Sequence, residues 1–174
     1  MAEGILITGL NGCGKSTVCR LLAEELNYFS MDVEDYYFIK SDIPYSKFHT
    51  LAETQRLMEC DIEKHKKFVL ATVNCNWGEK INSAFKLAVV LKAPLDIRME
   101  RIKTREYKKF GNRVLEGGDL YGSQQKFHSK VLTRTDEHIE KQLKYISCPV
   151  MELDATLPLT DIVNKIYKAY TKTA

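Results

Sequence analysis

A glycine-rich segment, GLNGCGKST at residues 9–17, constrains the fold of this chain more than any other feature. It contains the pattern G-x-x-x-x-G-K-[ST], follows the apolar run Ile5–Thr8 and precedes apolar side chains at helical spacing. Glycines let such a loop point several backbone N–H groups at an anion, and the next helix adds the positive end of its dipole. The segment therefore predicts a strand, a phosphate-binding loop and a helix, in that order.

The same pattern predicts how the loop binds a nucleotide. We expect Lys15 to reach the β- and γ-phosphates of a nucleoside triphosphate and the Ser16 hydroxyl group to ligate Mg²⁺. Thr17 is expected near the α-phosphate. The predicted cofactors are ATP and Mg²⁺, and the loop residues expected at the nucleotide are Gly9, Asn11, Gly12, Cys13, Gly14, Lys15, Ser16 and Thr17.

Apolar runs alternate with helical stripes along the rest of the chain. Further strands are predicted at residues 27–32, 68–73, 86–91 and 149–153, and helices at residues 46–66, from 95, at 123–144 and from 159. Four glycines between residues 111 and 122 predict an exposed loop. Strands alternating with helices indicate a parallel sheet with right-handed crossovers, so the expected fold class is α/β in a single domain, residues 1–174.

Composition excludes several classes of protein. The net charge is only +3, so a general nucleic-acid-coating role is not favoured. Five cysteines at irregular spacing fit neither a disulfide framework nor a zinc site, and the four histidines are expected on the surface. The sequence contains no apolar run of about 18 residues and no export signal, so we expect a cytoplasmic protein that does not span a membrane.

Several segments resemble the small-molecule kinases of the adenylate kinase and shikimate kinase type. KLAVVLKAPL at residues 86–95, followed by RIKTR at 101–105, is similar to their fourth strand and the helix that leads into their lid. LTRTDE at 132–137 resembles the helix after the lid, and LDATLP at 153–158 resembles the loop that packs on adenine. FGNRVLEGGDLY at 110–121 is similar to bacterial adenylate-kinase-like ATP-binding proteins with undefined substrates.

This resemblance implies a three-layer fold, like that of nucleoside monophosphate kinases, with a five-stranded parallel sheet. It also implies a small acceptor-binding insert, about residues 36–66, and a mobile lid, about residues 106–122. Further nucleotide-binding residues implied by it are Arg101, Arg105, Asp154 and Ala155.

Arginines are expected around the phosphoryl group that is transferred. Planar guanidinium groups can offset the charge that spreads over its oxygens, and the resemblance together with this demand assigns the role to Arg105, Arg113 and Arg134. Arg98 lies on the same helical stripe as Arg101 and Arg105, but there a solvated basic face is the expectation.

An acidic residue is missing where such proteins usually carry one. The predicted strand at residues 68–73 ends in Asn74, Cys75 and Asn76, which are uncharged. Asp32 and Glu34 close the preceding strand, and alternate strand residues point the same way. Shikimate kinases have a similar D-x-D there, which implies that Asp32 approaches Mg²⁺ through water and that Glu34 holds the acceptor hydroxyl. Asp35 is a rival for the second role, and a polar turn is the alternative for all three.

The acceptor is expected to be a small molecule with a hydroxyl group. A phosphate acceptor needs cationic clamps, but Arg56 is the one arginine between Arg20 and Arg98. Carboxylates suit an alcohol instead, because they can orient or deprotonate it. The predicted function is an ATP-dependent small-molecule kinase. The alternatives are a nucleoside monophosphate kinase, an ATPase or nucleotide switch, and a nucleic-acid 5′-end kinase.

Lys15→Met tests the assignment of the phosphate-binding loop. The substitution is expected to abolish phosphoryl transfer and to weaken ATP binding without unfolding the protein, because the side chain is directed at the anion rather than the core. The measurements are turnover, ATP affinity and the circular dichroism spectrum. Unchanged turnover in a folded variant would contradict the assignment.

Overall fold

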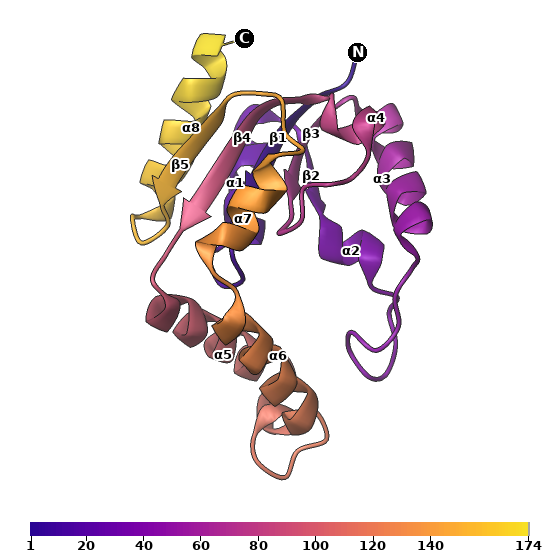
Figure 1. Ribbon diagram of the computed structural model, residues 1–174, viewed down its shortest axis with the longest axis vertical. Helices are drawn as coiled ribbons and strands as arrows, with labels where there is room; N and C mark the ends of the chain where they lie inside the picture. The colour runs from indigo at the N-terminus through magenta and orange to yellow at the C-terminus, as the bar shows by residue number, and fades with distance from the viewer. Residues whose placement is uncertain (174) are drawn as a thin grey trace.

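The centre of the protein is a five-stranded parallel sheet with the strand order β2-β3-β1-β4-β5 (Figure 1). The computed structural model describes residues 1–173. All pairings between neighbouring strands are parallel, so the predicted α/β fold is confirmed. The strands are β1 (Glu3–Thr8), β2 (Phe29–Asp32), β3 (Lys67–Ala71), β4 (Phe85–Lys92) and β5 (Val150–Asp154).

Helices cover both faces of the sheet and complete the three layers. α1 and α8 pack against one face, while α3 and α4 pack against the other. Figure 1 also shows α7 across the front of the sheet. The helices are α1 (Lys15–Leu26), α2 (Val33–Tyr37), α3 (Leu51–His65), α4 (Glu79–Asn82), α5 (Leu95–Phe110), α6 (Tyr121–Thr133), α7 (Asp136–Leu143) and α8 (Leu159–Thr173), with a short 3₁₀ helix at Gly111–Val114.

The alternation of side chains along β1 divides the hydrophobic core into two halves. Ile5 packs in the half that contains Leu22 of α1, whereas Leu6 packs in the half that contains Met58 of α3. All four side chains are fully buried. A strand buried on both faces has a continuous apolar sequence, which explains the run that precedes the phosphate-binding loop.

Some predicted boundaries are wrong for local reasons. The helix predicted at residues 46–66 begins only at Leu51, because Thr50 and Glu53 form a capping box at its start. The helix predicted at 123–144 is divided into α6 and α7, which are separated at Arg134 and Thr135. The loop predicted at residues 111–122 contains the 3₁₀ helix and the start of α6, and the two short helices α2 and α4 were not predicted.

The expectation of a surface position is also wrong for His128. Its Nε2 atom lies 2.7 Å from a carboxylate oxygen of Glu106, and the two side chains are only 12% and 7% exposed. Since Glu106 belongs to α5 and His128 to α6, this pair joins the two helices of one hairpin.

The sheet topology creates a binding position at its carboxyl edge. The chain turns to one side of β1 for β2 and β3 and then crosses to the other side for β4 and β5. Ligands of open parallel sheets bind where the connections diverge in this way. Both α2 and the α5–α6 hairpin lie beyond this edge (Figure 1). Within residues 1–173 no helix is long and apolar enough to span a membrane.

Candidate active site

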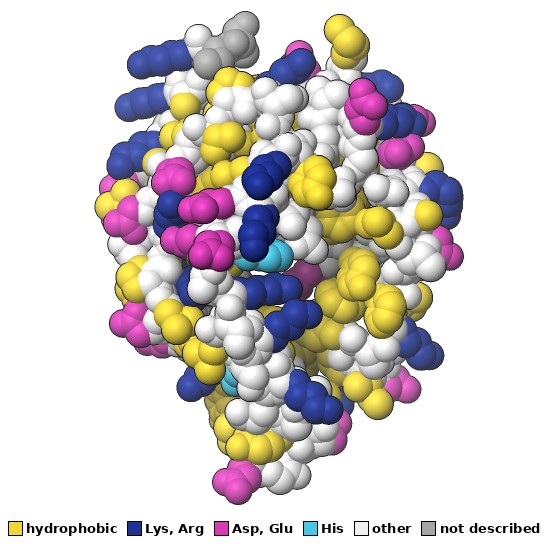
Figure 2. Space-filling model, viewed as in Figure 1, with side chains coloured by type: hydrophobic (Ala, Val, Ile, Leu, Met, Phe, Trp, Pro, Cys, Tyr) yellow, Lys and Arg dark blue, Asp and Glu magenta, His cyan; other side chains and the backbone are white. Residues whose placement is uncertain are grey.

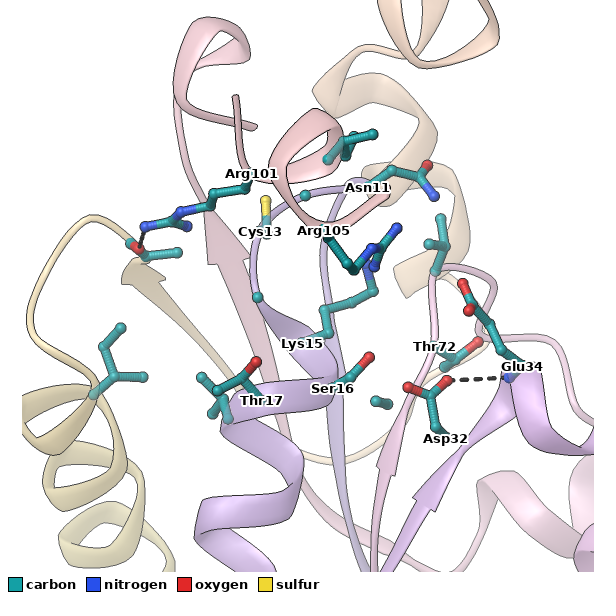
Figure 3. A pocket seen from close by; sticks show the side chains of 18 of the residues that line it. Asn11, Cys13, Lys15, Ser16, Thr17, Asp32, Glu34, Thr72, Arg101 and Arg105 are labelled. Atoms are coloured by element: carbon teal, nitrogen blue, oxygen red, sulfur yellow. Dashed lines mark hydrogen bonds between the residues drawn. The ribbon is translucent and has the colours of Figure 1, made fainter. Parts of the chain in front are cut away.

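A pocket of about 400 Å³ lies at the carboxyl edge of the sheet and extends along the phosphate-binding loop. Figure 2 shows Lys, Arg and His side chains beside a hollow on this side of the molecule, and Figure 3 shows the pocket from close by. Residues from five stretches of the chain line it: Asn11, Gly12, Cys13, Gly14, Lys15, Ser16, Thr17, Val18, Asp32, Val33, Glu34, Ala71, Thr72, Val73, Arg101, Ile102, Arg105, Ala155, Leu157, Leu159 and Ile162.

Glycine is required in the loop where other backbone comes close. Gly12 has φ +87°, and a Cβ atom there would lie 2.5 Å from the carbonyl oxygen of Arg98. Gly9 has φ +143°, and its Cβ would lie 2.3 Å from the carbonyl oxygen of Leu91 in β4. Gly9 is not among the described residues that line the pocket, so its place in the structure is against the sheet.

Lys15 lies in the middle of the pocket at the start of α1 (Figure 3). Its Nζ atom donates a hydrogen bond to the carbonyl oxygen of Leu10 at 3.1 Å. Loss of hydration, with a smaller contribution from the nearby Arg105, lowers the pKa of Lys15 to about 8, although Cys13, Glu34 and Asp32 oppose the shift. A phosphate ligand would supply the negative charge that favours its protonated form.

Asp32 and Glu34 both line the pocket, but strand alternation is not the reason. β2 ends at Asp32, whose Oδ1 atom accepts a hydrogen bond of 3.1 Å from the N–H of Glu34 and so caps α2. Glu34 is on the first turn of that helix (Figure 3). Its side chain is exposed at the pocket mouth, yet loss of hydration and the charge of Asp32 raise its pKa.

Asp35 is less well placed than its rival. It belongs to the same helix but is not among the described residues that line the pocket. Partial loss of hydration and the charge of Asp32 raise its pKa as well. The geometry therefore favours Glu34 over Asp35 for contact with an acceptor.

The residues that could hold Mg²⁺ are Ser16 and Asp32, which line the same pocket beside Lys15 (Figure 3). Within residues 1–173 no group of three or more His, Cys, Asp and Glu side chains could hold a metal ion. Mg²⁺ commonly needs only one or two protein ligands when nucleotide phosphates and water complete its shell. A hydroxyl group and a carboxylate beside the phosphate-binding lysine fit that mode of binding.

Two of the predicted arginines enter the pocket from α5. Arg101 and Arg105 line it, and the Nη2 atom of Arg101 donates to the carbonyl oxygen of Ala155 at 2.9 Å. Ala155 also lines the pocket, but Asp154 does not. The carboxylate of Asp154 instead accepts hydrogen bonds from the N–H and hydroxyl groups of Thr156, at 2.8 and 2.6 Å.

The solvated position expected for Arg98 is wrong. Arg98 is only 5% exposed, and its Nε and Nη1 atoms donate to the carbonyl oxygens of Ala93 and Asn11 at 3.1 and 3.2 Å. Helical periodicity could not reveal this contact, because the phosphate-binding loop covers this part of α5. Arg98 therefore supports the loop from outside the pocket.

Arg134 and Arg113 differ in their surroundings. The Nη1 atom of Arg134 donates to the side-chain oxygen of Asn11 at 2.7 Å, so this arginine meets the phosphate-binding loop. Arg113 instead forms an exposed ion pair of 2.7 Å with Asp119 inside the predicted lid. Neither Arg134 nor Arg113 is among the described residues that line the pocket.

Apolar lining residues were missed by the sequence analysis. The apolar residues Val18, Leu157, Leu159 and Ile162 all line the pocket. Leu159 and Ile162 belong to the apolar stripe of α8, and periodicity alone does not separate pocket-lining side chains from core. Leu157 lies in the segment LDATLP (residues 153–158), and Leu159 and Ile162 follow it closely. This proximity is the sequence feature that could have identified them as pocket residues.

The aromatic side chains of the predicted insert pack mainly on one another. The rings of Tyr37 and Phe48 are stacked, with 5.6 Å between centroids. Tyr45 makes an edge contact with Phe110 at the end of α5, and its hydroxyl group accepts a hydrogen bond from Lys109 at 3.0 Å. These contacts connect the insert to α5 beside the pocket, and none of these aromatic residues lines the pocket itself.

Comparison with known proteins supports the same interpretation of the fold. Residues 5–120 match the protein family described as "AAA domain". The chain is 29% identical to "Uncharacterized protein YqaC" of Bacillus subtilis, over 95% of this chain and 96% of that protein. It is 32% identical to a cytidylate kinase of Methanococcoides burtonii, over 64% of this chain and 68% of that protein.

A solved structure of shikimate kinase from Acinetobacter baumannii has a similar fold, with a TM-score of 0.61 and 16% sequence identity. The superposition covers 99% of this chain and 94% of that one. The predicted resemblance to P-loop small-molecule kinases is confirmed at the level of the fold.

Nucleotide binding is expected to be coupled to proton uptake by Lys15. Its pKa of about 8 in the free protein should rise when phosphates replace the lost hydration. At about pH 8.5 binding of Mg·ATP should take up most of one proton, and at about pH 7 very little, so affinity should fall as pH rises through 8. Calorimetry in buffers of different ionisation enthalpy measures this uptake. Equal apparent enthalpies at about pH 8.5 would contradict it.

The predicted lid should become more protected when nucleotide binds. Its middle has only short-range backbone hydrogen bonds, such as Gly118 N–H to Leu115 and Leu120 N–H to Arg113. A nonhydrolysable ATP analogue with Mg²⁺ should slow amide hydrogen exchange at residues 111–122 and around Arg134, whereas α3 should serve as an unchanged reference. Exchange that is already slow, or that does not respond, would exclude a mobile lid.

Proposed function

We propose that this chain, which belongs to the AAA domain family and has the fold of a P-loop kinase, transfers the γ-phosphoryl group of ATP to a hydroxyl group of a small molecule. One observation carries the proposal: the carboxylates of Asp32 and Glu34 line the same pocket as Lys15 of the phosphate-binding loop. An acid pair beside a phosphate site suits a metal ion and an alcohol rather than a second phosphate group.

The reaction uses the pocket residues in distinct roles. The acceptor oxygen attacks the γ-phosphorus atom, the bond to the β–γ bridging oxygen breaks, and ADP leaves. Glu34 accepts the proton of the acceptor hydroxyl, a role that its raised pKa favours. Lys15 and Arg105 stabilise the charge on the transferred oxygens. Ser16 and Asp32 would hold Mg²⁺, which would offset the negative charge of the phosphate groups.

Arg113 and Arg134 complete the proposed set of cations. Arg134 is already at the phosphate-binding loop through Asn11. Arg113 would have to leave its ion pair with Asp119 and bind a phosphate group instead. Both side chains of this pair are exposed to solvent, where ion pairs contribute little to stability. Closure of the predicted lid, residues 106–122, over the nucleotide would bring Arg113 to the site.

A nucleoside monophosphate kinase is the second candidate, because the cytidylate kinase relative is 32% identical over 125 residues. The cations available on the insert argue against it. Arg56 of α3 is exposed, and lysines make weaker bidentate clamps for a phosphate group.

We retain a cytoplasmic location as a prediction from the sequence.

The test is a screen for ATP consumption against pools of small molecules, coupled to mass detection of the product. A phosphorylated alcohol is the expected product. A diphosphate formed from a nucleoside monophosphate, with CMP as the first compound tried, would instead establish the second candidate. Turnover without any acceptor would indicate an ATPase or switch, and labelling of a 5′-hydroxyl oligonucleotide would indicate a nucleic-acid kinase.

Asp32→Asn and Glu34→Gln separate the two carboxylate roles. Asparagine can still cap α2, so Asp32→Asn removes charge while it preserves the local structure. It should lower kcat about a hundredfold, equivalent to about 3 kcal/mol, with little effect on nucleotide binding in metal-free buffer.

Glu34→Gln should also lower kcat but should leave the Mg²⁺ dependence of ATP binding unchanged. Initial rates over a range of Mg²⁺ concentrations measure both effects. Wild-type turnover of Asp32→Asn at low Mg²⁺ would show that the acid lies elsewhere, with Asp35 the next to be tested.

A further inference from the structure

Asn11, at a variable position of the phosphate-binding loop, is held by two arginines from separate parts of the chain. Its carbonyl oxygen accepts a hydrogen bond from Arg98 of α5 at 3.2 Å. Its side-chain oxygen accepts one from Arg134, between α6 and α7, at 2.7 Å. Asn11 also lines the pocket (Figure 3). One loop residue therefore contacts the helices at both ends of the predicted lid.

The contact with Arg98 fixes the main chain of the loop. The Arg98 side chain is buried, and its guanidinium group is shared between the carbonyl oxygens of Ala93 and Asn11. A buried guanidinium without such acceptors would be costly, so the contact is strongly favoured in the folded protein. Gly12, the next residue, lies directly against the backbone of Arg98. The position of Asn11 relative to α5 is consequently rigid.

The contact with Arg134 is made by the side chain alone. A guanidinium group has five N–H donors, and within residues 1–173 the structure gives Arg134 one side-chain hydrogen bond, to Asn11. The other donors remain available to a phosphate. Partial loss of hydration lowers the pKa of Arg134, which indicates that the group is withdrawn from water beside the loop. The guanidinium group is thus held beside the phosphate-binding loop before any nucleotide binds, although Arg134 is not among the described residues that line the pocket.

We propose that Asn11 is a positioning residue, whose side-chain amide holds Arg134 at the γ-phosphate while Arg98 holds Asn11 itself. The inference rests on the proposed role of Arg134 at the transferred phosphoryl group. A neutral amide suits this task, because its oxygen accepts from the guanidinium without adding negative charge beside the phosphates. Aspartate would accept as well but would repel the nucleotide, and alanine or serine would not reach Arg134.

A double-mutant cycle on nucleotide affinity tests this inference without any acceptor. The variants are Asn11→Ala, Arg134→Ala and the pair, and the ligands are Mg·ADP and a nonhydrolysable Mg·ATP analogue. Asn11→Ala should reduce affinity for the ATP analogue by a factor about ten times larger than the factor for ADP. The reason is that Arg134 would no longer be held at the γ-phosphate, which ADP lacks. The double variant should bind no worse than Arg134→Ala. Lys130→Ala, which removes an exposed charge one turn earlier on α6, is the matched control and should leave the ratio of the two affinities unchanged.

A purely structural role for Asn11 predicts different results. Equal losses for ADP and the ATP analogue, or additive effects in the double variant, would overturn the proposal. Should Asn11→Ala fail to fold, Asn11→Ser provides the same test, since its shorter side chain also loses Arg134. If the wild-type protein binds the analogue and shows the γ-phosphate selectivity but transfers nothing to any acceptor, the proposed function fails while the role of Asn11 stands.

Discussion

The close packing of the phosphate-binding loop on α5 is the contact on which the rest of the site depends. Gly12 lies against the backbone of Arg98, where a Cβ atom would be only 2.5 Å from a carbonyl oxygen, and Arg98 bonds to the carbonyl oxygen of Asn11. The same helix then carries Arg101 and Arg105 into the pocket. The loop, the helix and the segment after β5 are thereby held as one unit, because Arg101 also donates a hydrogen bond to the carbonyl oxygen of Ala155. Such preorganisation is what phosphoryl transfer requires, since it depends on positioning and charge rather than on covalent chemistry by the protein.

Charge in the pocket is balanced rather than merely positive. Lys15 is surrounded by Asp32, Glu34 and Arg105, and its pKa is low because hydration is lost while the charges partly cancel. Glu34 responds in the opposite direction, with a pKa raised by lost hydration and by Asp32. The pKa values of Lys15 and Glu34 are thus shifted toward each other, so the protonation of both groups depends on the charges that a ligand brings. In the proposed function, Asp32 and Glu34 replace the acid missing from the end of β3, and the cap of α2 fixes the position of Asp32 relative to Glu34.

Sequence alone predicted the parts of the structure that local chemistry determines. The phosphate-binding loop, the parallel sheet and the positions of Lys15 and Ser16 follow from a motif in its strand–helix context, whereas Arg101 and Arg105 were placed by the resemblance to small-molecule kinases. The burial of Arg98 could not be predicted, because its partner Asn11 is 87 residues away. The same holds for His128, which is paired with Glu106 across a hairpin whose geometry the sequence did not reveal. Asp32 and Glu34 were placed at the pocket, but by strand alternation rather than by the helix cap that positions them.

The central claim is that phosphoryl transfer takes place in this pocket and that a hydroxyl group receives it. Phosphorus NMR of the protein with Mg·ATP and an active acceptor pool tests this most directly, because the phosphorus signals of ATP, ADP and the product are observed together. The account predicts a new phosphomonoester signal that grows in proportion to ADP, and its absence in the Lys15→Met variant. Growth of inorganic phosphate alone, or of a new diphosphate signal in place of the monoester, would contradict it.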